Sequence, residues 1–139
     1  MALTHELNDA ARAFLQEPRF AVVATVSPNG TPQQTVNWYL VEGDEIMFNT
    51  RRGRIKDRNL SRNQHVSICI EDNYRYVTIR GQVQIIEDQA TAQADIKRLA
   101  IRYHGREKGE NMAATGFTKE ERISYRVKLD HVSVYGFDS

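Results

Sequence analysis

The stretch FAVVATVSPNGTPQQTVNWYLV, from Phe20 to Val41, decides the fold. Its first part, Phe20–Val26, is rich in β-branched residues, which favour strands. Ser-Pro-Asn-Gly follows at Ser27–Gly30, and its Asn-Gly pair supplies the positive φ angle that a tight hairpin turn requires. The remainder, Thr31–Val41, again suits a strand. The stretch therefore predicts two antiparallel strands joined by a short turn.

Five further segments have strand-like composition, and turn residues or helical patterns separate them. They are EIMFN (Glu45–Asn49), HVSICIE (His65–Glu71), RYVTIRGQVQII (Arg75–Ile86), ISYRVKL (Ile123–Leu129) and HVSVYGF (His131–Phe137). Gly81 lies inside the longest of them, which predicts a bend or bulge of the kind that barrels use to curve. Barrel closure removes the edges that an open sheet would expose. The expected fold class is mainly β: a small antiparallel barrel of seven strands with about three helices.

The three helices are predicted from spacing and capping. Thr4 is expected to cap a short N-terminal helix that Pro18 ends. A basic segment after Asn49 predicts a loop that opens into a helix near Arg54. Asp88–His104 has apolar residues at helical spacing on one side. Gly105–Phe117 contains three glycines and is predicted to be a mobile loop.

Length, charge and cysteine content limit the class of protein. The 139 residues suit one core, so we expect a single domain over residues 1–139. The formal net charge is +1, so any charge-driven binding must be local. Cys69, the only cysteine, cannot form an internal disulfide, and the N-terminus lacks the pattern of a secretory signal. No apolar run approaches the roughly 20 residues that span a bilayer. These features predict a soluble cytoplasmic protein that does not bind membranes.

The most informative local feature is the basic segment TRRGRIKDRNLSR, Thr50–Arg62. Arginine offers a planar fork to phosphate oxygens, lysine adds a compact charge, and Gly53 lets the backbone approach closely. A helix that begins near Arg54 would add free N–H groups and its dipole. The segment therefore predicts a phosphate site, although on composition alone a solvated basic turn explains it as well.

A second feature is QQTVNWYL, Gln33–Leu40, in which polar residues fall on both faces of the predicted strand. Amides on either side of Trp38, the only tryptophan, could offer hydrogen bonds and an aromatic edge to a planar ring. A core position for Trp38 is the alternative. The four histidines are scattered without metal-ligand spacing, so no metal site is expected. No catalytic side chain can be assigned.

The order of these motifs resembles a known family. A QxTVNW strand, a strand that ends in FNT and the segment RRGRIKDRNL are similar to the pyridoxamine 5'-phosphate oxidase-like, FMN-binding split-barrel superfamily. The resemblance extends from Phe14 to Phe137 and is strongest to the branch that uses the deazaflavin coenzyme F-420. It implies a split β-barrel, and a homodimer with a flavin-type ring in a groove between two subunits.

The resemblance also implies roles for individual residues. Arg54 and Lys56, with Ile55 between them, would hold the cofactor phosphate, and Asn49 and Thr50 would contact the ribityl chain and phosphate. Four residues would line the ring, namely Thr35, Val36, Asn37 and Trp38. Asn59 would fix the loop, and Arg80 would reach the cofactor from the other subunit. The further arginines Arg51, Arg52 and Arg58 would suit the acidic lactyl-glutamyl tail of coenzyme F-420.

The function that follows is an oxidoreductase in which reduced coenzyme F-420 passes a hydride to an unsaturated small molecule. Because the cofactor carries the chemistry, no catalytic side chain is required. An FMN-dependent oxidase or reductase is one alternative, and a cofactor carrier without turnover is another. Nucleic-acid binding through the arginine helix is disfavoured, because the net charge is near neutral and there is no second basic stripe.

Overall fold

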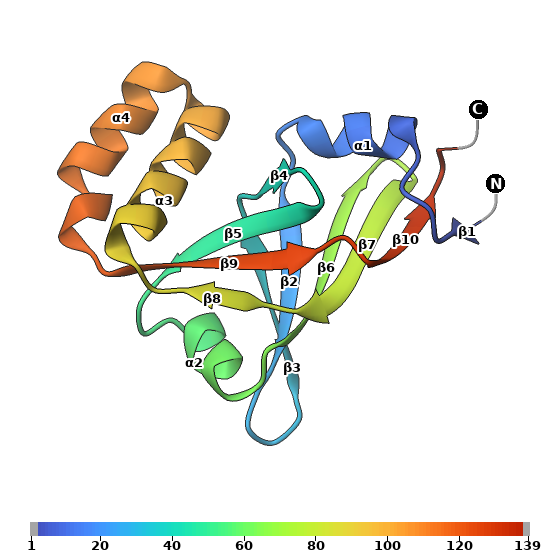
Figure 1. The fold of residues 1–139 in the computed structure, drawn as a ribbon, viewed down its shortest axis with the longest axis horizontal. Coiled ribbons are helices and arrows are strands. Elements are labelled where there is room, and N and C mark those ends of the chain that lie inside the picture. Colours follow the sequence, from blue (N-terminus) through green and yellow to red (C-terminus); the bar gives the residue numbers. More distant parts are fainter. Residues whose placement is uncertain (1–2, 138–139) are drawn as a thin grey trace.

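Two antiparallel sheets form the body of the protein (Figure 1). The computed structural model describes residues 3–137. One sheet has six strands in the order β1-β10-β7-β6-β2-β3, and the other has four in the order β4-β5-β9-β8. The strands are β1 (Leu3–Thr4), β2 (Ala21–Val26), β3 (Pro32–Asn37), β4 (Leu40–Glu42), β5 (Glu45–Arg51), β6 (His65–Asp72), β7 (Arg75–Gln82), β8 (Gln84–Ile86), β9 (Arg122–Lys128) and β10 (His131–Tyr135).

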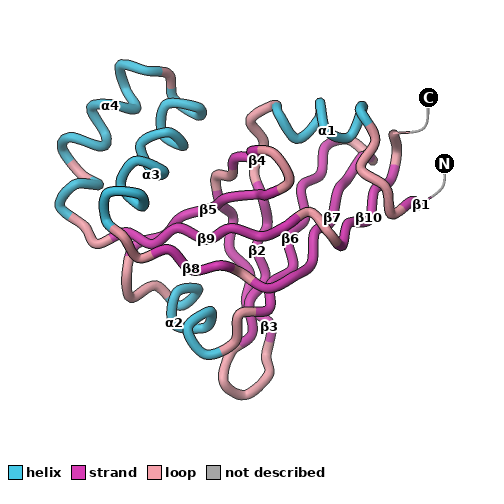
Figure 2. Tube along the Cα trace, viewed as in Figure 1, coloured by secondary structure: helices cyan, strands magenta, loops and turns pink. Residues whose placement is uncertain are grey.

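Four α-helices and one short 3-10 helix complete the described part of the chain (Figure 2). They are α1 (Asp9–Gln16), α2 (Ile55–Arg62), α3 (Gln89–His104), α4 (Arg106–Thr115) and the 3-10 helix Phe117–Lys119. Within residues 3–137, no helix is both long and apolar enough to cross a membrane.

The two sheets share one hydrophobic core. Val23 and Ile68 of the six-stranded sheet belong to the same buried cluster as Ile46 and Phe48 of the four-stranded sheet. The predicted fold class, a mainly β antiparallel split barrel, is confirmed. The predicted hairpin is also present, because β2 pairs with β3 in antiparallel register from Ala21 and Asn37 to the turn.

The structure contains three more strands than the sequence predicted. One is β1, and the other two arise because the chain changes sheet within two of the predicted strands. The predicted strand 75–86 divides at Val83 into β7 and β8, just after Gly81. The predicted strand 31–41 divides at Trp38 and Tyr39 into β3 and β4, which belong to different sheets. A side chain on Gly81 would lie 3.2 Å from Val127 Cγ1, so the predicted bend is also a point of close packing.

The predicted N-terminal helix is present, but its predicted cap is wrong. Thr4 lies in β1, where it pairs with Val134. Helix α1 begins at Asp9, and Asn8 caps it by accepting a hydrogen bond from the Ala11 backbone N–H at 2.8 Å. Asparagine is as good an N-cap as threonine, and the strand pairing of Thr4 moves the helix start along the chain.

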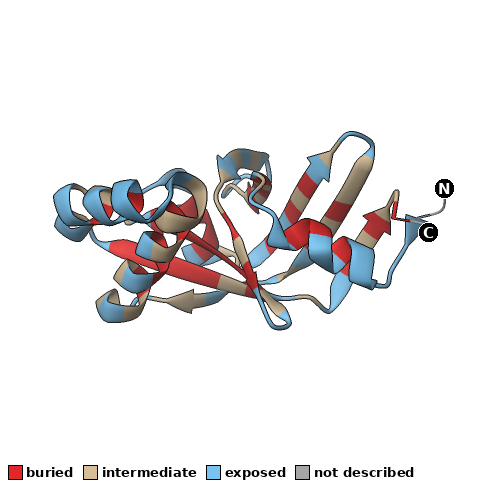
Figure 3. Ribbon diagram, turned by 90° about the horizontal axis from the view of Figure 1, so that it is seen from above, coloured by how far each residue is buried: buried red, intermediate tan, exposed pale blue. Residues whose placement is uncertain are grey.

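The predicted loop at Gly105–Phe117 is also wrong, because most of it forms helix α4. Gly105, with φ of 86°, separates α3 from α4, and the two helices lie side by side at one end of the four-stranded sheet (Figure 1). Their outer sides are exposed, and their buried positions face each other and the sheet (Figure 3). The glycines therefore serve a helical turn and close helix packing rather than mobility.

Gly109 lies where the backbones of α4 and α3 are packed closely together. A Cβ atom there would lie 2.5 Å from the backbone nitrogen of Ile101. Helix propensity alone would make Gly109→Ala stabilising by about 1 kcal/mol. We expect the opposite sign, a loss of about 1–3 kcal/mol in the free energy of unfolding, because the clash involves backbone that cannot move aside.

Urea unfolding of Gly109→Ala would test this expectation. Asn111→Ala, at an exposed position of the same helix, is the matched control and should stay within about 0.5 kcal/mol of the unchanged protein. A Gly109→Ala protein as stable as that control would contradict the packing argument.

Candidate anion-binding site

A cavity of about 440 Å³ lies between β3, the end of β5 and the start of α2. Its lining residues are Gln33, Thr35, Val36, Asn37, Asn49, Thr50, Arg51, Arg54, Ile55, Lys56 and Arg122. Four of these eleven described residues are cationic, and none is acidic. Such a lining suits an anionic ligand.

Lys56 is, with Arg122, one of two buried cations that line the cavity. Its side chain is on α2, and Nζ donates a hydrogen bond to Thr35 Oγ1 at 3.2 Å. Among residues 3–137, no carboxylate forms an ion pair with it. Burial, together with the smaller effect of repulsion from Arg54 and Arg122, lowers the pKa of Lys56 to about 8. A buried charge without a partner is unfavourable, and an anion in the cavity would relieve that cost.

The start of α2 adds to the positive potential. Arg54 is the N-cap residue, and its exposed side chain forms no ion pair within residues 3–137. The first turn of a helix leaves backbone N–H groups without intrahelical partners, and its dipole favours anions. Gly53, with φ of 95°, permits the turn into the helix, and its N–H donates to Asp57 Oδ2 at 2.9 Å.

Asp57 is buried and holds this turn in place. Its carboxylate accepts hydrogen bonds from the Tyr125 hydroxyl at 3.0 Å and from Arg52 Nη1 at 3.4 Å, besides the one from Gly53. Burial, and then the charge of Asp57, raise the pKa of Tyr125. Asp57 therefore ties the loop before α2 to β9.

The three additional arginines of the basic segment have different surroundings. Arg52 forms ion pairs with three carboxylates, those of Glu87, Glu121 and Asp57, and it does not line the cavity. Arg58 is exposed on α2 and also lies outside the lining. Of these three arginines, only Arg51 lines the cavity.

The structure brings eight of the eleven predicted site residues together around this one cavity. They are Thr35, Val36, Asn37, Asn49, Thr50, Arg54, Ile55 and Lys56. Val36 and Ile55 are large apolar residues that are exposed there, at 66% and 49% of their full area. β3 is an edge strand, so one side of its backbone is free to form hydrogen bonds.

Three predicted residues do not line this cavity. The Trp38 ring stacks on Tyr103 of α3 at 5.4 Å between ring centroids. Asn59 is buried, and its Nδ2 donates to Thr25 Oγ1 at 3.0 Å, so it connects α2 to β2. Arg80 lies elsewhere, on β7.

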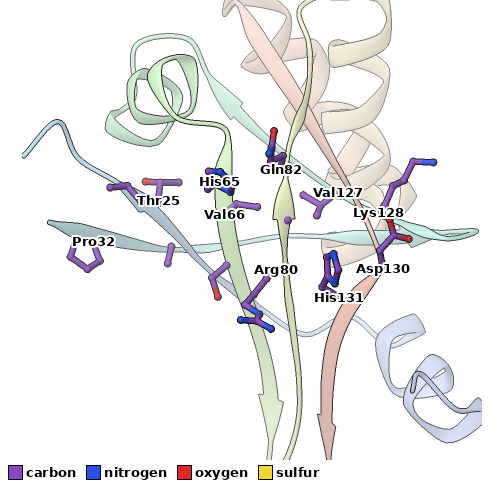
Figure 4. Close-up of a pocket in the computed structure, with 14 residues that line it drawn as sticks. Thr25, Pro32, His65, Val66, Arg80, Gln82, Val127, Lys128, Asp130 and His131 are labelled. Atoms are coloured by element: carbon purple, nitrogen blue, oxygen red, sulfur yellow. The ribbon is translucent and has the colours of Figure 1, made fainter. Parts of the chain in front are cut away.

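Arg80 lines a second, larger cavity of about 920 Å³ (Figure 4). Its neighbours across the strands are Ser67 of β6 and His131 of β10. Residues of β2, β6, β7, β9 and β10 line this cavity, which continues to Lys128 and Asp130. Within the chain, Arg80 therefore lines a different cavity from Lys56.

The sequence analysis missed two lining residues, Gln33 and Arg122. Gln33 precedes the predicted group in the same strand, so alternation of side chains along β3 was an available signal. Arg122 had no such signal. It reaches the cavity because β9 pairs with β5, which places it directly opposite Arg51.

Comparison with known sequences identifies the family. A model described as pyridoxamine 5'-phosphate oxidase matches residues 7–134. A pyridoxine/pyridoxamine 5'-phosphate oxidase from Vibrio parahaemolyticus is 30% identical over 127 residues, which are 89% of this chain and 56% of that protein. The chain thus spans about half the length of the curated relatives that it matches.

Solved structures with the same architecture include an F-420 reductase, which is 28% identical, with a TM-score of 0.67 over 84% of this chain and 90% of that chain. A conserved hypothetical protein from Mycobacterium tuberculosis is 25% identical, with a TM-score of 0.78 over 94% of this chain and 86% of that chain. The sequence match begins just before α1 and ends within β10, and the split barrel agrees with it. The chain belongs to the pyridoxamine 5'-phosphate oxidase family.

Proposed function

We propose that this protein is an oxidoreductase that binds coenzyme F-420 and transfers a hydride to an unsaturated small molecule. The observation that carries the proposal is Lys56, a buried and unpaired cation that faces a cavity with Arg54 at a helix N-terminus. This arrangement suits the phosphate of a cofactor better than a solvated basic turn, in which lysine stays exposed.

The same cavity has features that suit a ring beside the phosphate. Val36 and Ile55 offer exposed apolar surface, and the free edge of β3 offers backbone donors and acceptors. The Thr35 hydroxyl accepts from Lys56 and donates to Asn37 Oδ1 at 2.9 Å, which connects the ring side of the cavity to the phosphate side. We therefore assign the ring to β3, and the phosphate to Thr50, Arg54 and Lys56.

A bound deazaflavin or flavin would supply the hydride chemistry itself. The residues of the chain bind and orient it: the cations hold the anionic end, and the apolar side chains remove water from one part of the ring. The structure of the described residues assigns no proton donor, and the proposal requires none from the protein, because solvent can supply the proton.

The choice of coenzyme F-420 is supported by the F-420 reductase, which resembles this chain over 90% of its own length. FMN is the second candidate, because the order of motifs resembles an FMN-binding superfamily. Curated relatives named pyridoxine/pyridoxamine 5'-phosphate oxidase match this chain over about half of their length. The third candidate, a cofactor carrier without turnover, would bind the cofactor in the same cavity. It differs from the two enzymes only in having no activity.

Fluorescence titration with coenzyme F-420 and with FMN separates these candidates. We expect tighter binding of coenzyme F-420, and oxidation of the reduced coenzyme in the presence of at least one unsaturated acceptor. Tighter binding of FMN, or FMN released from denatured protein, would support the second candidate. Tight binding without turnover over a broad acceptor panel would support a carrier, and the absence of binding for both compounds would refute the proposal.

The pH dependence of binding is a separate prediction that follows from Lys56. Because its pKa is lowered to about 8, the ammonium loses its proton as the pH rises through that value. We expect the affinity for coenzyme F-420 to be highest below pH 8 and to fall by up to tenfold per pH unit above it, as measured by fluorescence titration from pH 6.5 to 10.

Lys56→Arg is the matched variant for this titration. Arginine stays charged throughout that range, so the fall above pH 8 should disappear even where the affinity at pH 7 has changed. An unchanged fall in Lys56→Arg would assign the pH dependence to another group.

We also propose that two copies of the chain form a homodimer and that the partner copy supplies Arg80 to the ligand. Support comes from the position of Arg80 on a surface separate from the cavity of its own protomer. Light scattering after size exclusion should give twice the mass of 16.0 kDa. A monomer with intact cofactor binding would refute both parts.

A further inference from the structure

Arg122 reaches the candidate cavity from β9, a strand distant in sequence from the basic segment. Its side chain is buried, and it lines the cavity with Arg51, Arg54 and Lys56. Nε donates to Asn49 Oδ1 at 3.0 Å, and Nη1 donates to Glu120 Oε1 at 2.8 Å. Within residues 3–137, Nη2 has no hydrogen-bond partner. One side of the guanidinium is thus held by the protein, and the other remains available to a ligand.

Asn49 differs from Arg122, because its side chain is fully occupied by the protein. Its Nδ2 donates to the Ala92 carbonyl at 3.0 Å and to Ser124 Oγ at 2.9 Å, while Oδ1 accepts from Arg122. Both N–H groups are therefore used, and they fix the direction in which Oδ1 points. Asn49 has no donor left for the anionic end of a ligand.

The arrangement is anchored in the helix above the sheet. Ser124 lies opposite Asn49 across the β5–β9 pair, and its hydroxyl donates to Asp95 Oδ2 of α3 at 2.7 Å. Asp95 and Ser124 are both buried. A continuous line of hydrogen bonds therefore runs from Asp95 through Ser124 and Asn49 to Arg122.

The charges around the cavity are unbalanced in favour of an anion. Lys56 and Arg122 are both buried, and each lies near enough to Arg54 to be affected by its charge. Among the described residues, Glu120 is the one carboxylate that pairs with Arg122, and it also pairs with Arg51 at 3.5 Å. One carboxylate thus serves two arginines, and Lys56 has none. An incoming group with at least one full negative charge would complete the site.

We propose that Arg122 binds the phosphate-side group of the ligand, and that Asn49 is a positioning residue that orients the Arg122 guanidinium. The inference rests on the proposed function, because it takes the same cavity as the cofactor site. It adds a third cation to Arg54 and Lys56, and it moves Asn49 from direct contact with the ligand to an indirect role.

The role of Arg122 is tested by comparing the affinities for a compound with and without its phosphate. We call the ratio of these two affinities the phosphate increment. FMN is compared with riboflavin, and 8-hydroxy-5-deazariboflavin 5'-phosphate with 8-hydroxy-5-deazariboflavin, by fluorescence titration, because each pair differs in the phosphate alone. We expect Arg122→Leu to lower the increment at least tenfold and to leave the affinity for the phosphate-free compound within about twofold. A purely structural role for Arg122 would lower both affinities together and would overturn the inference.

Arg122→Lys is the second variant, which keeps the charge and loses the planar fork. It should retain more of the phosphate increment than Arg122→Leu does. If Arg122→Leu does not fold, Arg122→Lys alone tests the role of Arg122. A phosphate increment equal to that of the unchanged protein would then count against a direct contact. Arg58→Ala, an exposed arginine of α2 outside the cavity, is the control and should leave the increment unchanged.

A double-mutant cycle tests the role of Asn49. Asn49→Leu should lower the phosphate increment in the unchanged background and have little further effect in Arg122→Leu. An equal effect in both backgrounds would mean that Asn49 contacts the ligand itself. Ser124→Ala, which removes one of the two acceptors of Nδ2, should have a smaller effect because the Ala92 carbonyl remains.

The failure of this inference and the failure of the proposed function give different results. If Lys56→Met lowers the phosphate increment and Arg122→Leu does not, the cofactor site stands and the role of Arg122 is refuted. If neither variant changes the increment, the cavity is not the phosphate site, and both proposals fail.

Discussion

Replacement of Lys56 by methionine is expected to weaken cofactor binding by about 10- to 100-fold and, at the same time, to stabilise the ligand-free protein. The loss of affinity corresponds to about 1.5–3 kcal/mol, the range of a hydrogen bond to a charged group. Methionine has a similar length and no charge, so it fills the same buried space. If Lys56 served the fold alone, its replacement by methionine would instead destabilise the ligand-free protein.

The gain in stability follows from the pKa of Lys56. The pKa is 10.5 for an ordinary lysine and about 8 in the folded protein, so at neutral pH the folded state holds a proton that burial disfavours. The shift corresponds to a cost of about 3 kcal/mol, of which methionine should recover a part. Between about pH 8 and pH 10.5 the unfolded state still holds the proton that the folded state has lost. A rise in pH therefore favours the folded state in this range, and the cost of burying Lys56 falls.

Urea unfolding of the ligand-free proteins at pH 7 and pH 10 tests both parts of this argument. Lys56→Met should be more stable than the unchanged protein at pH 7, and the difference should be smaller at pH 10. Arg58→Ala, on the same helix and exposed, should change neither stability nor affinity. A Lys56→Met protein that is less stable at pH 7 would mean that Lys56 has a structural partner.

Asp57→Ala should have the largest effect on stability, a loss of about 2–4 kcal/mol. Hydrogen bonds to a charged group contribute about 1.5–3 kcal/mol each, and Asp57 is the buried acceptor of several. The substitution leaves the Tyr125 hydroxyl and the Gly53 N–H without their acceptor, and it removes one of the three carboxylates that pair with Arg52. Because Tyr125 is buried, water cannot easily replace the lost partner.

Thermal unfolding, with circular dichroism as the signal, measures this loss. Arg58→Ala is again suitable as a control, since it is one residue away and exposed. Those Asp57→Ala molecules that stay folded should also bind the cofactor more weakly than the unchanged protein does, because the loop at Gly53 has lost its anchor. A loss below about 1 kcal/mol would show that the Asp57 network contributes little to stability.

Much of the fold was predictable from local patterns. The hairpin from Ala21 to Asn37 follows from β-branched residues and an Asn-Gly turn, and the start of α2 follows from a basic segment after a strand. The errors have a common cause. The division of the strands at Val83 and Trp38 and the helix at Arg106–Thr115 depend on packing against distant elements, which local propensity does not record.

The sequence by itself determined where most strands lie along the chain, the Asn-Gly hairpin and the position of Arg54 and Lys56 at the start of α2, because these depend on residues close together in the chain. Only the tertiary structure decided which cations share the cavity. It neutralised Arg52 with three carboxylates, placed Arg80 on another surface and joined Asn49 to Arg122, 73 residues away. The physical reason is that strand pairing and burial select the partners of each charge. They bring together segments that are far apart in the sequence, and the local sequence does not indicate which segments will meet.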